Sequence, residues 1–144
     1  MADTVRKVEY FSIQVADQPG EAFGVLQALV AAGINLLACT AHRVGDRARI
    51  DVVPEDTAGF HAAMSGAGLG FAARKSGFLI QGDDRPGALA QNLHQLAKAG
   101  INVTGIDAMA AGKGRWGAIL WVEPRDVVKA GRALGAADDS LTQP

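Results

Sequence analysis

The chain has 144 residues, of which 49% are hydrophobic and 20% charged, and its formal net charge is −1. This balance is typical of a soluble globular protein and gives no electrostatic case for binding nucleic acid or an anionic membrane. Cys39 is the only cysteine, so an internal disulfide and a Cys-rich zinc site are excluded.

The first half of the chain predicts a strand, a helix, a hairpin and a second helix. A β-rich run at 9–16 ends at the turn Asp-Gln-Pro-Gly (17–20), and the helix that follows ends at Gly33 with Ile-Asn after it. Two further strands are expected at 36–44 and 47–53. Pro54 then opens the second helix, and a short run at 71–75 is a candidate last strand. Cys39 alternates with Thr40 in an apolar strand, and we expect it to be a small buried residue.

The second half repeats the same order. The run at 77–82 leads into Asp-Arg-Pro-Gly (84–87), and the next helix ends in Gly-Ile-Asn (100–102). Strands are expected at 103–111 and 115–122, with a helix after Pro124. The two prolines of the turns and the two glycines of the helix ends fall on one offset without a gap, which indicates an internal repeat.

The fold class that follows is α+β, with two ferredoxin-like βαββαβ units. Each would have an antiparallel sheet with two helices on one face. We place the domains at 1–75 and 76–144. Only polar residues follow the last predicted helix, so two alternatives stay open: the second sheet has three strands, or residues 71–75 serve the second copy.

These residues resemble a known family. A unit with D-x-P-G at the start of its first helix and G-I-N at its end is similar to the ACT domain, and the chain resembles a tandem pair of them without a catalytic domain, over about 8–75 and 77–135. The resemblance implies a regulatory, allosteric role, in which paired domains bind a small ligand, most often an amino acid. It also implies a regulated enzyme as a partner.

Physical reasoning supports a ligand site at each helix start. First-turn amides have no partner within the helix and suit a carboxylate, while Asp and Asn side chains can meet an ammonium group. The resemblance adds the residue directly before each Pro. The candidate ligand-binding residues are Asp17, Gln18, Gly20, Glu21, Ala22, Asn35, Asp84, Arg85, Gly87, Ala88, Leu89 and Asn102.

These residues also have other interpretations. Asp17 and Asp84 are favoured as helix caps over ligand contacts. Amino-acid-binding members carry a His four residues before the Pro, whereas this chain has Val15 and Gly82, which leaves the ligand open. Of the two copies we favour the second, whose turn is more polar.

The alternative function is a protein–protein interaction module without a small ligand. No nucleophile motif is present and no two histidines have metal-ligand spacing, so we expect neither an enzyme nor a metal or other cofactor. We expect a homodimer. We also expect a cytoplasmic location, because no signal-like or 18-residue apolar run occurs.

Overall fold

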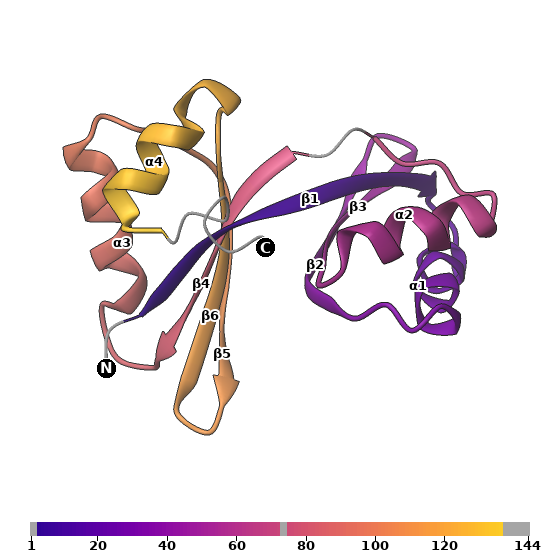
Figure 1. Ribbon diagram of the computed structural model, residues 1–144, viewed down its shortest axis with the longest axis horizontal. Coiled ribbons are helices and arrows are strands. Elements are labelled where there is room, and N and C mark those ends of the chain that lie inside the picture. The colour runs from indigo at the N-terminus through magenta and orange to yellow at the C-terminus, as the bar shows by residue number, and fades with distance from the viewer. Residues whose placement is uncertain (1–2, 73–74, 137–144) are drawn as a thin grey trace. The chain divides into compact units, whose positions relative to one another are not determined.

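The computed structural model describes residues 3–72 and 75–136, which divide into two compact units. The first unit is Glu9–Lys75, and the second combines residues 3–8 with residues 76–136. The sequence had suggested a first domain of 1–75. The structure instead groups the start of the chain with the second unit (Figure 1).

The first unit is a sheet covered on one face by two helices (Figure 1). Its elements are β1 (Thr4–Ala16, from residue 9 onward), α1 (Glu21–Ala31), β2 (Leu36–Val44), β3 (Arg47–Pro54) and α2 (Thr57–Gly66). The strand order is β2-β3-β1, and both pairings are antiparallel. Cys39 lies on the edge strand β2 and is exposed, so the expectation of a buried cysteine is wrong.

The core of the first unit forms where alternate residues of its strands face the helices. Phe11 of β1 stacks on Phe60 of α2 with ring centroids 4.7 Å apart, and both are fully buried. Phe71 packs edge-on against the same two rings. The backbone N–H of Ala72 donates to the Ser12 carbonyl at 2.8 Å. Residues 71 and 72 therefore serve the first copy, whereas 73 and 74 lie outside the described residues.

The second unit has the same layers (Figure 1). Its elements are β4 (Lys75–Asp83), α3 (Ala88–Lys98), β5 (Val103–Gly112), β6 (Arg115–Val122), the 3-10 turn η1 (Pro124–Asp126) and α4 (Val127–Leu134). Its strands follow the order β1-β4-β6-β5. Side chains of β4, β6 and the two helices make the core, with Phe78 and Leu120 fully buried at its centre.

The last strand of the second unit comes from the opposite end of the chain. The hydroxyl of Thr4 donates to the Gln81 carbonyl at 3.3 Å, and Val5 packs on the core of this unit. The start of β1 thus takes the edge position next to β4, where a ferredoxin-like unit has its fourth strand. Neither alternative drawn from the sequence describes this arrangement: the sheet has four strands, and the fourth is not 71–75.

Candidate functional site

The two repeated turns hold the chain in the same conformation just before a helix. Gly20 precedes α1 with φ 88°, and Gly87 precedes α3 with φ 82°. Both angles lie in the left-handed region, where a side chain costs conformational energy and glycine does not. No side chain caps either helix. The first amide of each helix is nevertheless engaged by its own turn. The N–H of Glu21 donates to the Gln18 carbonyl and that of Ala88 to the Arg85 carbonyl, both at 3.3 Å, so only the later amides of each first turn can be open.

The aspartates of the turns do not act as helix caps. Asp17 pairs with Arg43 instead, with its Oδ2 atom 2.7 Å from Nε. Asp84 is exposed, and its backbone N–H donates to the Gly114 carbonyl at 2.8 Å. The interpretation of both residues as caps is wrong, because the left-handed glycine takes the capping position itself.

The asparagines of the two G-I-N segments lie at the far ends of their helices. Asn35 follows α1 and donates from Nδ2 to Oε2 of Glu55 at 2.9 Å, and Asn102 is exposed directly before β5. Each helix has 11 residues, which separates its two ends by roughly 16 Å. Within one unit, the structure therefore does not bring the asparagine to the glycine turn.

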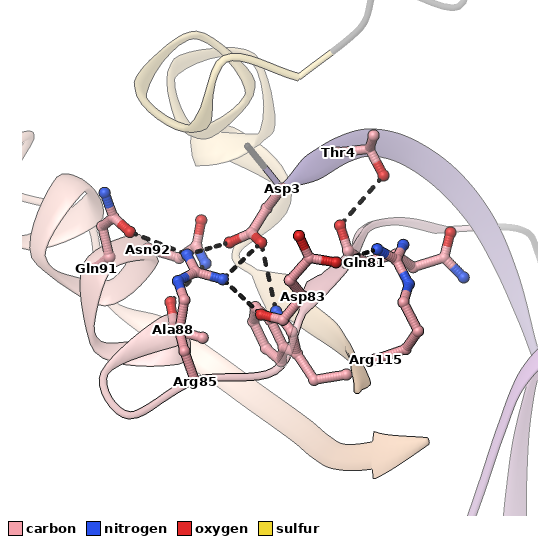
Figure 2. Close-up of polar contacts among 10 residues, drawn as sticks. Asp3, Thr4, Gln81, Asp83, Arg85, Ala88, Gln91, Asn92 and Arg115 are labelled. Carbon is pink, nitrogen blue, oxygen red and sulfur yellow. Dashed lines mark hydrogen bonds and ion pairs between the residues drawn. The ribbon is translucent and has the colours of Figure 1, made fainter. Parts of the chain in front are cut away.

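Arg85, in the second turn, is the centre of a polar network (Figure 2). Its Nη1 and Nη2 atoms donate to Oδ1 and Oδ2 of Asp3 at 3.0 and 3.1 Å, which is a bidentate ion pair. Nη1 also donates to the carbonyl of Asp83 at 2.7 Å, and Nη2 to Oε1 of Gln91 at 3.2 Å. One guanidinium thus joins the start of β1, the end of β4 and the first turns of α3.

Asp3 is the more buried partner of this pair. Its side chain is 10% exposed, against 36% for Arg85. The indole Nε1–H of Trp116 also donates to Oδ1 of Asp3, at 3.4 Å. The hydrogen bonds from Arg85 hold the pKa of the Asp3 carboxyl below its usual value, although burial acts in the opposite direction. Asp3 is therefore a carboxylate at neutral pH.

Gly82 makes room for the Asp3 side chain. A Cβ atom at position 82 would lie 1.8 Å from Oδ1 of Asp3 and 3.2 Å from its Cα. No side chain can occupy that space while Asp3 lies there. The position at which the resembling family carries its ligand-binding His is thus, in this chain, a gap filled by a carboxylate from residue 3.

A cavity of about 220 Å³ opens beside this network. It is lined by Asp3, Val5, Arg85, Gln91, Asn92, Gln95 and Leu134. Asn92 is buried and donates from Nδ2 to the Ala88 carbonyl at 3.2 Å, which leaves its Oδ1 as an acceptor. The lining combines a guanidinium, the Asp3 carboxylate that pairs with it, three amide side chains and two apolar side chains, which suits a small polar molecule.

The sequence identified part of this site and missed most of its lining. Arg85 lies in the cavity wall, Gly87 precedes α3, Leu89 is half-buried and Ala88 packs in the core. In the first unit, Gln18, Gly20, Glu21 and Ala22 are all exposed. Gln91 and Gln95 lie four residues apart on one face of α3, which was a readable signal. Nothing local in the sequence marks Asp3.

Comparisons with known proteins were made for the sequence and for the fold. No protein-family model matches the chain, and no curated protein matches it. A crystal structure of a Bacteroides thetaiotaomicron protein is similar to the chain with a TM-score of 0.75 and 18% identity, covering 89% of this chain and 88% of that one.

Regulatory subunits of aspartate kinase are also similar. The ligand-free subunit from Thermus thermophilus gives a TM-score of 0.63 at 22% identity, and the one from Thermus flavus 0.60 at 21%. Each comparison covers 94% of this chain and 95% of the other. At these identities the likeness concerns the fold. The chain has the fold of two ACT-type domains in tandem, as the resemblance implied.

The described residues contain neither a membrane-spanning helix nor a cluster of metal ligands. Within residues 3–72 and 75–136, no helix is long and apolar enough to cross a membrane. The same part of the chain has no group of three or more His, Cys, Asp or Glu side chains placed to hold a metal ion.

Proposed function

We propose that the chain is a non-catalytic regulatory protein whose two ACT-type units bind a small ligand, an amino acid. The observation that carries this proposal is the cavity of the second unit, which is lined by the Arg85 guanidinium and by the amide side chains of Gln91, Asn92 and Gln95 on α3. The chain shares its fold with proteins described as regulatory subunits of aspartate kinase, which supports a regulatory role. A cytoplasmic location and a regulated enzyme as partner belong to the same proposal.

The proposed contacts follow from charge. A ligand carboxylate would be stabilised by Arg85 and by the positive end of α3, whose first-turn amides follow Gly87. The side-chain oxygens of Gln91 and Asn92 can accept from an ammonium group. In the first unit, the corresponding amides follow Gly20.

The two asparagines could contact a ligand only if domains pair with one another. Asn35 and Asn102 lie a helix length from their own turns, so they can contact the same ligand only from another domain or another copy. We therefore keep a homodimer in the proposal. Light scattering should give twice the chain mass of 14.9 kDa, and a mass equal to one chain would contradict the dimer.

Thermal unfolding in the presence of each of the twenty amino acids, at millimolar concentration, tests the ligand. A ligand at a hundred times its dissociation constant stabilises the folded chain by about 2.7 kcal/mol. Arg85→Gln should abolish the shift caused by the active amino acid, while Arg125→Gln, at an exposed arginine outside the cavity, should keep it. If no amino acid moves the midpoint of the wild-type chain, the ligand proposal fails.

An interaction module without a small ligand is the second candidate function. Phe23 and Val30 of α1 are 68% and 67% exposed, and their spacing of seven places them on one helix face. Two exposed apolar side chains on one helix face can contribute to a contact with another protein. Replacing both by Gln should reduce self-association or capture of a partner without affecting ligand shifts.

A further inference from the structure

Asp3 holds Arg85 in the way that a ligand carboxylate would. Both carboxylate oxygens face both terminal nitrogens of the guanidinium, at 3.0 and 3.1 Å, and this planar pairing is the usual mode of carboxylate recognition by arginine. The carboxylate comes from a residue 82 positions away in the sequence. Figure 2 shows the Asp3 side chain pointing from the start of β1 toward Arg85.

Residues other than Arg85 also help to place the Asp3 carboxylate. Trp116 donates an indole N–H to it, and Gly82 leaves the space that its oxygen occupies. The cavity continues from the same pair along the amide side chains of α3. A carboxylate thus lies at the end of a cavity, where it meets a guanidinium and an indole donor.

We propose that the Arg85 cavity is a binding site for a small molecule with a carboxylate group, and that Asp3 is a built-in competitor which this molecule displaces. The inference deepens the proposed function and rests on it, because it names what the second unit binds and what binding must remove.

The exchange is balanced in charge and in hydrogen bonds. The incoming carboxylate takes the two guanidinium donors and the Trp116 donor, while the Asp3 carboxylate moves into water. The other two bonds of Arg85, to the Asp83 carbonyl and to Gln91, stay as they are. Arg85 therefore has a carboxylate partner both before and after the exchange.

The lining indicates the class of ligand. Asn92 and Gln95 offer amide groups that both donate and accept, and Val5 and Leu134 offer apolar surface. The cavity of about 220 Å³ is smaller than the sites of drug-sized molecules, which begin at roughly 300 Å³. A carboxylic acid with a polar group and a short aliphatic part, such as a neutral amino acid, matches this lining.

Displacement of Asp3 would act on β1. Asp3 directly precedes this strand, whose Thr4 bonds to Gln81, and the same strand continues into the first unit from residue 9. Release of its first residues is a means by which a ligand in the second unit changes a strand that both units use.

Acetate is the probe that tests the competitor. The chain has two tryptophans, so the indole N–H signals of Trp116 and Trp121 can be followed separately by NMR and assigned with Trp116→Phe. In Asp3→Ala, and in the isosteric Asp3→Asn, acetate should move the Trp116 signal saturably. If the Asp3–Arg85 pair is open in roughly a tenth of wild-type molecules, acetate should bind these variants about tenfold more tightly than it binds the wild type. Asp46→Ala, at an exposed aspartate, is the matched control and should behave as the wild type.

Three results would overturn the inference. Equal acetate affinity in the wild type and both Asp3 variants would show that Asp3 does not compete. Failure of acetate to saturate either Asp3 variant, with circular dichroism showing a folded chain, would remove the carboxylate site. Arg85→Gln combined with Asp3→Asn should bind no acetate, and binding there would place the site elsewhere.

The same measurements separate this inference from the proposed function. Acetate binding in the Asp3 variants, with no amino acid stabilising the wild type, supports the competitor and contradicts the amino-acid ligand. An amino acid that binds the wild type and Asp3→Asn equally, without moving the Trp116 signal, supports the proposed function and refutes the competitor.

Discussion

Substitution of Gly87 by alanine tests whether the turn before α3 depends on backbone conformation alone. The residue has φ 82°, and a Cβ atom built there meets nothing within 4 Å. No steric clash therefore contributes to the cost. The remaining term is the left-handed conformation itself, which costs an L-residue about 1–2 kcal/mol.

Gly24, inside α1, is the matched control. A Cβ atom there also meets nothing within 4 Å, but its φ is not in the left-handed region. Alanine at this position should stabilise the chain by about 0.4–1 kcal/mol, because it restricts the unfolded chain and favours the helix. The same chemical change thus has opposite signs at the two glycines.

Thermal unfolding measures both effects. For a chain of this length, 1 kcal/mol corresponds to about 2–4 °C in Tm. Gly87→Ala should therefore lower Tm by about 2–8 °C, and Gly24→Ala should raise it by about 1–4 °C. A Gly87→Ala chain as stable as the wild type would refute the requirement for a left-handed residue, and a fall of more than about 10 °C would reveal a contact that the structure does not contain.

Three further predictions follow from the second unit and from the core of the first. The pKa of Asp3 is lowered from 3.8 in the folded chain, so its contribution to stability is present above that pH and is lost as the pH falls through the lower folded value. The Tm difference between the wild type and Asp3→Asn should be present at pH 7 and shrink as the pH is lowered progressively below 3.8, and a difference that does not shrink would contradict the pairing. Gly82→Ala should expel the Asp3 side chain and move the Trp116 indole signal as Asp3→Ala does, whereas an unmoved signal would show that Asp3 does not lie there. Phe71→Ala should destabilise the folded chain by about 3 kcal/mol or less, since the ring is half-buried. Hydrogen exchange should become faster in α1 and α2, whereas faster exchange confined to β5 and β6 would show that residue 71 does not pack in the first unit.

The sequence predicts most elements of the fold because their signals are local. The turns ending at Gly20 and Gly87 mark two helix starts, and the structure begins α1 and α3 at the next residue. Strand patterns likewise give β2, β3, β5 and β6 nearly to their ends. The exposure of Cys39 was not predictable in this way, since alternation does not say whether a strand lies at the edge of its sheet.

The last strand of the second unit and the partner of Arg85 depend on long-range pairing. Thr4 and Asp3 meet Gln81 and Arg85 across some eighty positions, and no periodicity or turn signal links them. The sequence shows that Gly82 departs from the family pattern, but only the structure shows what fills the space. Local sequence chemistry therefore identifies Arg85, whereas its partner Asp3 is known only from the topology of the fold.

The shared strand β1 also sets an order of events during synthesis. Residues 3–8 are synthesised before every other strand of the sheet that they complete; the last of those strands is β6, and α4 covers the sheet only after Leu134. At 5–20 residues per second, this interval is roughly 6–26 s. The first unit can form its own core during that time. Residues 3–8 of β1, in contrast, cannot complete their sheet until β4 and the rest of the second unit have been synthesised.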